Sequence, residues 1–319
     1  MPDPAFLSDA GNQGRPPVAL IAGPTASGKS AVALRLAKAH GGVIINADAS
    51  QVYADLAVLT ARPSADEIAE APHRLFGHID GAQACSAAFW ADEARDEIEQ
   101  AHAQGRLPIL VGGTGLYLDT LLYGIAPVPD IDPAIRAAVR ALPVTEAHAA
   151  LANEDPAAAA RLNPADSTRV ARALEVVRST GRPLHHWQAH RSGGIAGRMH
   201  VRAVVVMRPR EELAMHAERR LTQMLAGGAI EEVEALLARG LPTDRPVLRA
   251  LGVREIGDML TGRLSIAEAQ AAILATTTAY QKRQLTWARN RQRAWAKSTP
   301  DAIGAVDDLP LLLHDSRAA

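Results

Sequence analysis

The sequence contains a single cysteine, Cys85, among its 319 residues. One thiol excludes an internal disulfide and a zinc site built from several cysteines, and it fits a reducing compartment. Long apolar runs are missing as well, so we expect neither a membrane span nor a membrane partner. The first residues show no basic start followed by an apolar segment, which argues against a secretory signal. We therefore expect a cytoplasmic protein in which residues 1–16 form a disordered tail.

Aromatic residues make up only 3% of the chain, although 48% of its residues are hydrophobic. The core is therefore expected to consist mainly of alanine, leucine, valine and isoleucine side chains. The formal net charge of −1 at pH 7 neither indicates nor excludes a nucleic-acid partner. Only the local distribution of charge can decide that question.

Short apolar runs alternate with helical patterns in the first part of the chain. The pattern predicts buried strands over residues 18–22, 43–46, 107–111 and 201–209, and helices over residues 29–40 and 87–104. Alternation of this kind is typical of an α/β fold in which helices cover both faces of a parallel sheet.

The composition and periodicity of the sequence change at the proline-rich segment GIAPVPDIDP, residues 124–133. Beyond it, residues 134–182 are rich in alanine and arginine and have helical periodicity. We interpret residues 126–199 as an all-helical insertion domain within a core formed by residues 17–125 and 200–319. After the insertion, long helices are expected over residues 211–239 and 266–297.

Residues 23–30, GPTASGKS, match the pattern G-x-x-x-x-G-K-[ST] of a phosphate-binding loop and lie between an expected strand and an expected helix. Glycines let backbone N–H groups face a ligand, and the helix N-terminus adds partial positive charge. Lys29 would meet a terminal phosphate, and the Ser30 hydroxyl suits Mg²⁺. Such loops usually hold ATP or GTP, but this chemistry suits any diphosphate. A glycine-rich turn without a ligand is the alternative.

Two polar positions follow the next strands. Asp48 comes after the second expected strand, where open α/β sheets place their ligands, and it suits either an Mg²⁺ ligand or a base. A turn or helix-capping aspartate is the alternative. Thr114 lies in the segment GGTGLYL after the third expected strand, where a tight turn without ligand contact is equally compatible with the pattern.

Residues 282–297, KRQLTWARNRQRAWAK, carry six basic residues and no acidic one. Trp287 and Trp295 are eight apart, so one helix would place them on the same face. Cations attract phosphate backbones and aromatic rings stack on unpaired bases, so this segment favours nucleic-acid contact. Arg169 and Arg172 in the insertion share a helical face and suit phosphate as well. Ordinary solvated surfaces are the alternative in both cases.

Taken in order, the motifs resemble those of the tRNA dimethylallyltransferase family. They are GPTASGKS, ADASQVYADLAVLTARP, APHRLFGHID, LVGGTGLYL, STRVARALEV, MLAGGAIEEVEAL and YQKRQLTWARN, and they extend from about residue 18 to residue 290. The ordered set is far more specific than the loop alone. The resemblance implies a P-loop NTPase-like sheet with a helical insertion, and transfer of a dimethylallyl group to a tRNA adenosine beside the anticodon. A small-molecule kinase using ATP is the first alternative. A non-enzymatic, nucleotide-gated RNA-binding protein and an enzyme that prenylates free AMP are the others.

The resemblance also implies roles for individual residues. Asp48 would be the general base, Thr114 would contact the transferring group or the target base, and Arg220 would hold diphosphate. Dimethylallyl diphosphate would bind at Gly23, Pro24, Thr25, Ala26, Ser27, Gly28, Lys29 and Ser30, with Mg²⁺ as cofactor at Ser30. Contacts to tRNA would come from Asp48, Ala49, Ser50, Gln51, Arg136, Thr168, Arg169, Val170, Ala171, Arg172, Arg249, Arg254, Lys282, Arg283, Gln284, Leu285, Thr286, Trp287, Ala288 and Arg289. We expect a monomer.

Five positions depart from the family pattern. Cys85 stands where tyrosine is frequent, and Leu59 replaces a glycine. Ala49 follows the expected base where serine is common, His216 stands where an arginine is usual, and Val253 replaces a tyrosine. None of these changes removes the proposed base or the phosphate loop.

Overall fold

The computed structural model describes residues 14–305 and 308–309. Most of the expected tail, residues 1–16, therefore lies outside the described residues. The described residues form two compact units. The larger unit contains residues 14–122 and those from 195 onward, and the smaller unit contains residues 123–194.

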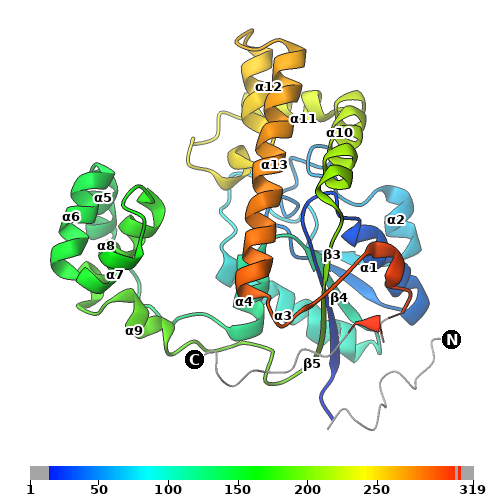
Figure 1. Ribbon diagram of the computed structural model, residues 1–319, viewed down its shortest axis with the longest axis horizontal. Coiled ribbons are helices and arrows are strands. Elements are labelled where there is room, and N and C mark those ends of the chain that lie inside the picture. Colours follow the sequence, from blue (N-terminus) through cyan, green and yellow to red (C-terminus); the bar gives the residue numbers. More distant parts are fainter. Residues whose placement is uncertain (1–13, 306–307, 310–319) are drawn as a thin grey trace. The chain divides into compact units, whose positions relative to one another are not determined.

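The larger unit is built on a parallel sheet (Figure 1). Within the described residues the sheet has six strands in the order β3-β2-β4-β1-β5-β6, and each neighbouring pair is parallel. The strands are β1 (Pro17–Ala22), β2 (Val43–Asn46), β3 (His73–Arg74), β4 (Pro108–Gly112), β5 (His200–Val206) and β6 (Ala296–Ser298). Every residue of β1, β2 and β4 is buried, as expected for strands covered on both faces.

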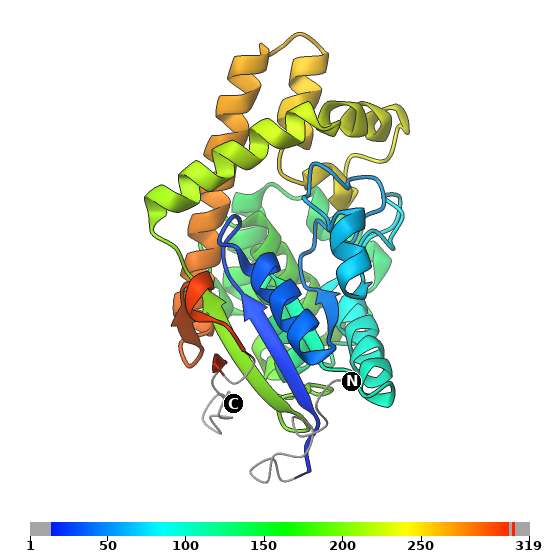
Figure 2. The same ribbon diagram turned by 90° about the vertical axis from the view of Figure 1, so that its right-hand side faces the viewer.

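Helices lie on both faces of this sheet. Helix α1 (Lys29–His40) covers one face, and α3 (Ala87–Ala103) and α4 (Gly115–Tyr123) cover the other (Figure 1 and Figure 2). The short helix α2 (Ala65–Glu70) begins at a Ser64 capping box, which satisfies two backbone N–H groups at its start. Strands β1, β2 and β4 and these helices confirm the alternation predicted from the sequence.

A second helical layer follows β5. It contains α10 (Arg210–Ala226), α11 (Ala229–Ala238), the 3₁₀ turn η2 (Pro246–Arg249), α12 (Val253–Leu260) and α13 (Ile266–Arg291). The 3₁₀ turn η3 (Pro300–Ala302) follows β6. The strand expected over residues 201–209 ends at Val206, because Pro209 caps α10.

The prediction of a single helix over residues 211–239 is wrong. The segment forms two helices, separated by Gly227 and Gly228. Gly228 has a φ of 104°, in the left-handed region that favours glycine, and it forms the N-cap of α11. The helical spacing of apolar residues continues across these two glycines, so the sequence pattern did not indicate the break.

The helix expected over residues 266–297 is also too long. Helix α13 ends at Arg291, and residues Ala296–Ser298 form β6 beside β5. Trp295 lies beyond the helix and is 4% exposed. The expectation that Trp287 and Trp295 share one helical face is therefore wrong.

The smaller unit is helical. Its helices are α5 (Pro133–Ala141), α6 (Val144–Glu154), α7 (Pro156–Arg161), α8 (Ser167–Thr180) and α9 (Leu184–Gln188). Proline or aspartate begins several of these helices; Asp132, Asp155 and Asp166 each accept a backbone N–H at a helix start. Val139, Leu151, Val170 and Leu174 form much of its core.

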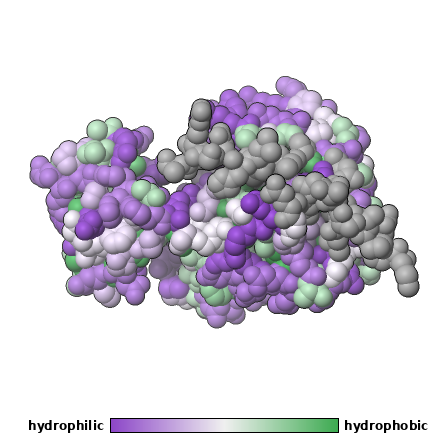
Figure 3. All heavy atoms as spheres, turned by 90° about the horizontal axis from the view of Figure 1, so that it is seen from below, coloured by the Kyte–Doolittle hydropathy of each residue, from purple (hydrophilic) through white to green (hydrophobic). Residues whose placement is uncertain are grey.

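The face drawn in Figure 3 is predominantly polar. Hydrophilic side chains cover most of the face drawn in Figure 3, and apolar side chains are scattered among them. Among the described residues, no helix combines the length and apolar character needed to cross a membrane.

Candidate active site

The phosphate-type loop joins β1 to α1, as the sequence predicts. Its last residue before the helix, Gly28, has a φ of 90° and caps α1 without a side-chain hydrogen bond. Gly23 is equally constrained, since an added Cβ would lie 2.6 Å from the Val206 carbonyl oxygen. The loop thus approaches its neighbours too closely for larger residues, and the first turn of α1 has backbone N–H groups without a side-chain cap.

Two glutamines of α13 hold this loop. The Thr25 N–H donates to Oε1 of Gln284 at 2.8 Å, and Nε2 of Gln281 donates to the Thr25 carbonyl at 2.9 Å. Nε2 of Gln284 also donates to the Gly113 carbonyl at 3.1 Å, in the loop after β4. Both glutamines are buried. Sequence reasoning did not predict this role, because amides on a polar helix suggest solvent exposure.

A cavity of about 420 Å³ opens beside the loop. Thr25, Ala26, Gly28, Lys29 and Ser30 line it from the loop, whereas Gly23 and Pro24 face a smaller space under α13. Ser27 is fully buried. Only part of the predicted phosphate set therefore borders the cavity.

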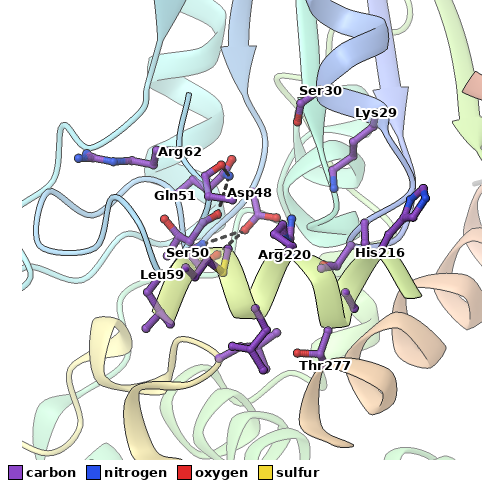
Figure 4. Close-up of a pocket in the computed structure, with 18 of the residues that line it drawn as sticks. Lys29, Ser30, Asp48, Ser50, Gln51, Leu59, Arg62, His216, Arg220 and Thr277 are labelled. Carbon is purple, nitrogen blue, oxygen red and sulfur yellow. Dashed lines mark hydrogen bonds between the residues drawn. The ribbon is translucent and has the colours of Figure 1, made fainter. Parts of the chain in front are cut away.

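The cavity brings one carboxylate and two cations together. Asp48, Lys29 and Arg220 all line it, and Figure 4 shows their side chains converging from the end of β2, from α1 and from α10. Desolvation by the surrounding protein lowers the pKa of Lys29 to about 8, while Asp48 raises it and Arg220 lowers it. Desolvation likewise lowers the pKa of Arg220, against the opposing effect of Asp48. Arg62, Arg208 and Glu67 also line the cavity, so its lining has four cationic and two carboxylate side chains, an excess of positive charge suited to an anionic ligand.

Asp48 is held in place by its own neighbours. The Asp48 N–H donates to Oδ1 of Asn46 at 2.8 Å, and Nδ2 of Asn46 donates to the Asp48 carbonyl at 3.0 Å. The Asp48 carboxylate accepts from the Ser50 N–H at 3.1 Å and from the Ser50 hydroxyl at 2.7 Å, both at Oδ1. The turn role and the site role, alternatives at the level of sequence, are thus combined in one residue, which is 9% exposed.

Thr114 supports this segment from β4. Its hydroxyl accepts from the Ala49 N–H at 2.9 Å, and its own N–H donates to the Ala47 carbonyl at 3.2 Å. Its side chain is also hydrogen bonded to Tyr280, a residue of α13 that lines the cavity. Burial, together with the nearby Asp48 charge, raises the pKa of Tyr280, so its hydroxyl stays protonated. Sequence reasoning quoted the motif that contains Tyr280 but assigned it no role.

The opposite rim is a loop that contains Leu59, Thr60, Ala61 and Arg62. The Glu232 carboxylate of α11 accepts backbone N–H groups of Ala57, Val58 and Leu59 at 2.8–3.0 Å. Nε2 of Gln51 donates to the carbonyls of Thr60 and Ala61 at 2.8 Å. Sequence reasoning also missed Glu232, although it lies in the quoted block MLAGGAIEEVEAL.

The residues expected to contact tRNA divide into exposed and buried groups. On α13, Lys282, Arg283, Thr286 and Arg289 are exposed, whereas Gln284 and Ala288 are buried and Leu285 is partly buried. Arg249 and Arg254 are exposed as well. Gln284 cannot offer its amide to RNA without losing its bonds to the loop, so its predicted contact is not supported by the geometry.

Part of the Trp287 ring is packed against the protein. Its Nε1 is buried and has no hydrogen-bond partner in the described part of the chain, and an added Cβ at Gly115 would lie 2.2 Å from the indole. This close approach packs one edge of the indole between α13 and the start of α4. Trp287 as a whole is partly exposed, and its predicted contact with tRNA stays a prediction.

The same division holds in the smaller unit. Thr168, Arg169 and Arg136 are exposed, and Arg172 is partly exposed. Val170 is fully buried in the core of this unit, so it cannot contact a partner through its side chain. Ala171 is partly buried.

Metal ligands of the usual kind are not gathered here. Among the described residues, no group of three or more histidine, cysteine, aspartate or glutamate residues could hold a metal ion. Ser30, the predicted Mg²⁺ residue, lines the cavity and is exposed. A hydroxyl beside a phosphate loop fits Mg²⁺ only where a bound phosphate and water supply most of the ligands.

Comparison with known proteins places these features in a family. A model of the IPP transferase family matches residues 51–291. The chain is 62% identical to the tRNA dimethylallyltransferase of Sphingopyxis alaskensis over 302 residues, 94% of this chain and 99% of that protein. It is 50% identical over 299 residues to the protein of the same name from Zymomonas mobilis, which covers 93% of this chain and 96% of that protein.

Solved structures agree with this comparison. The full-length tRNA isopentenylpyrophosphate transferase from Bacillus halodurans matches with a TM-score of 0.64 at 32% identity, over 89% of each chain. A eukaryotic dimethylallyltransferase acting on tRNA matches with a TM-score of 0.76 at 26% identity, over 86% of this chain and 70% of that one. The fold is P-loop NTPase-like, and the chain belongs to the IPP transferase family.

Proposed function

We propose that this protein transfers the dimethylallyl group of dimethylallyl diphosphate to the N6 amine of the adenosine beside a tRNA anticodon. The observation that carries the proposal is the meeting of Lys29, Arg220 and Asp48 in one cavity at the phosphate loop. The relatives named tRNA dimethylallyltransferase support it, and they do not support the kinase alternative. We further propose that the protein acts as a monomer in the cytoplasm.

The cations would bind and stabilise the departing diphosphate. An allylic carbon–oxygen bond loosens early, so negative charge grows on the diphosphate during the transition state. Lys29, Arg220 and the N-terminus of α1 border the cavity, where they would meet this charge as it develops. The loop then holds a leaving group rather than a phosphoryl group in transfer.

Asp48 would accept the proton of the adenine amine. The lone pair of this amine is delocalised into the ring, so the amine becomes strongly acidic only as it bonds to the allylic carbon. Ser50 donates to Oδ1 of Asp48, an arrangement that orients the carboxylate while its other oxygen takes no part in those bonds. Thr114 would act as a positioning residue through Ala49 and Tyr280.

The other residues that line the cavity suit the isoprenoid chain of the donor. Leu59, Leu221, Met224 and Ile273 line the cavity and offer an apolar surface to the isoprenoid chain. The adenine has to leave the anticodon loop to reach Asp48, and extrusion of a partly unpaired base costs at most a few kcal/mol. Mg²⁺, where bound, would be held by Ser30 and would supply additional charge neutralisation to the diphosphate.

One experiment tests the proposal directly. Unmodified tRNA is incubated with the protein and labelled dimethylallyl diphosphate, and the nucleosides are then analysed by mass spectrometry. We expect N6-dimethylallyladenosine and release of diphosphate. A parallel reaction with labelled ATP is the control, and phosphate transfer from ATP without prenylation would establish the kinase alternative instead.

A further inference from the structure

A cluster of four charged side chains joins α5 to α8 in the smaller unit. Arg136 and Arg140 lie one turn apart on α5, while Arg172 and Glu175 lie one turn apart on α8. Nε of Arg140 donates to Oε1 of Glu175 at 2.9 Å. Nε of Arg136 and NH1 of Arg172 approach Oε2 of the same carboxylate at 4.0 Å and 3.9 Å. All three guanidinium groups therefore surround one carboxylate.

The charges in this cluster do not balance. Glu175 is 1% exposed, so its charge requires a partner, and within the described part of the chain Arg140 provides the hydrogen-bonded one. The other two arginines contribute attraction at longer range but also repel each other. Desolvation lowers the pKa of Arg172, and the charges of Arg136 and Arg140 lower it further, whereas Glu175 raises it. Three cations around one anion leave an excess of two positive charges.

An ion pair between α8 and α6 shows the contrast. Arg178 of α8 makes hydrogen bonds of 2.7–3.1 Å to both oxygens of Glu154, in a one-to-one bidentate pair. That pair is neutral and satisfies both partners. The cluster around Glu175 has more cations than its carboxylate needs, and the side chains of Arg136, Arg140 and Arg172 remain 47%, 65% and 43% exposed.

We propose that Arg136, Arg140 and Arg172, arranged around Glu175, form a binding site for one backbone phosphate of the tRNA. The proposal rests on the proposed function and extends it. The family resemblance suggested Arg136 and Arg172 as separate contacts, while Arg140 and Glu175 had no role. A phosphate would neutralise the surplus charge and accept the guanidinium N–H groups that Glu175 does not use. Glu175 is then a positioning residue that holds the three guanidinium groups on one spot.

The test compares two substitutions that remove the same charge from the same unit. Arg140→Gln removes a cation of the proposed site, and Arg178→Gln removes the neutralised cation of the pair with Glu154. The affinity of each variant for unmodified tRNA is measured at several salt concentrations, and prenylation is measured at saturating tRNA. For Arg140→Gln we expect about a five-fold loss of affinity and a log–log salt slope smaller by about 0.7 to 0.9. We expect no change of slope for Arg178→Gln, and kcat within two-fold of the parent for that variant.

Equal salt slopes for the parent and Arg140→Gln would overturn the proposal. Equal losses of tRNA affinity in Arg140→Gln and Arg178→Gln would overturn it as well. Failure of the proposed function looks different. If the parent binds tRNA with the expected salt dependence but does not prenylate it, the phosphate site stands and the reaction is wrong. If the parent binds no tRNA, both are wrong.

The positioning role of Glu175 has its own measurement. In a Glu175→Gln background, the guanidinium of Arg140 loses its anchor, so we expect Arg140→Gln to change tRNA affinity less than two-fold there. A full five-fold effect in that background would show that Glu175 does not position the site. Circular dichroism of the two proteins that carry Glu175→Gln checks that their helices are intact. If the helices are lost, the comparison of Arg140→Gln with Arg178→Gln in the parent background still tests the phosphate site.

Discussion

Gln284 of α13 accepts a hydrogen bond from the Thr25 N–H at 2.8 Å and donates one to the Gly113 carbonyl at 3.1 Å. One side chain thus joins the helix that carries the exposed Lys282 and Arg289 to the loops that follow β1 and β4. The Thr25 N–H is also taken by this bond, so it is not available to a phosphate. The loop is held in shape by α13 before any ligand binds.

Replacement of Gln284 by leucine tests this connection. Gln284→Leu keeps the approximate size but leaves a buried N–H and a buried carbonyl without partners, at a cost of about 1–3 kcal/mol each. We expect a lower melting temperature and a KM for dimethylallyl diphosphate raised at least five-fold, with tRNA affinity within two-fold. Thr278→Ala on the exposed side of α13 is the matched control and should change neither. A Gln284→Leu protein with the parent's donor KM would contradict the connection.

Replacement of Asp48 by asparagine tests the proposed base. Asp48→Asn keeps the shape of the side chain but cannot accept the proton, so we expect kcat to fall by about 10²–10⁴-fold with tRNA affinity within a few-fold. Ser50→Ala keeps the carboxylate and removes one hydrogen bond to it, so its loss should be much smaller. The measurement is single-turnover prenylation at saturating substrates. Nearly intact turnover of Asp48→Asn would rule out this residue as the base.

The response to pH follows from Lys29. Because desolvation lowers the pKa of Lys29 to about 8, the ligand-free protein loses this positive charge as pH rises through that value. Phosphate groups of the donor finish ionising near pH 6, so changes above pH 8 come from the protein. The KM for dimethylallyl diphosphate should therefore rise as pH increases from 7.5 to 9.5.

Lys29→Arg is the control for the pH experiment. Arginine stays protonated throughout this range, so the variant's donor KM should be flat with pH whatever its absolute value. Donor KM is measured at saturating tRNA across the range for both proteins. Parallel pH profiles for the parent and Lys29→Arg would exclude Lys29 as the titrating group.

The exposed cations of α13 are expected to contact the tRNA backbone. Substitution of both Lys282 and Arg289 by alanine should reduce the log–log salt slope of tRNA affinity by about 1.4 to 1.8, since each lost phosphate contact contributes about 0.7 to 0.9. Arg283 is less informative, because its guanidinium lies 5.4 Å above the ring of Tyr280, which lines the cavity. Lys38→Ala is the control, since Lys38 is paired with Glu70. A slope equal to that of the parent would remove this part of α13 from the RNA footprint.

Much of the core could be predicted from local patterns. The loop between β1 and α1 follows from glycine positions whose backbone conformation or close packing admits little else, and β1, β2 and β4 follow from short, wholly apolar runs. Lys29 was identified from the phosphate-loop pattern, and Asp48 and Thr114 from their places after strands, where open α/β sheets gather ligands. Arg220 came from the family resemblance.

Other features depend on contacts that no local pattern contains. The backbone groups of β5 needed a neighbour at the sheet edge, and β6 fills that place, which ends α13 at Arg291 and buries Trp295. Gln281 and Gln284 sit in a polar helix yet are buried, because the loop they bind lies 256 and 259 residues away in sequence.

Local sequence is enough to predict the phosphate loop, the runs that are buried as strands and the residue types that could bind a diphosphate, because those properties arise from each residue and its near neighbours. Tertiary structure decided which side chains meet. The pairing of Arg136 and Arg140 with Glu175, the hydrogen bonds from the loop containing Leu59 to Glu232 and the approach of Arg220 to Asp48 all join distant segments. Their free energy comes from charge and hydrogen-bond complementarity between packed elements, and it exists only once those elements are in contact.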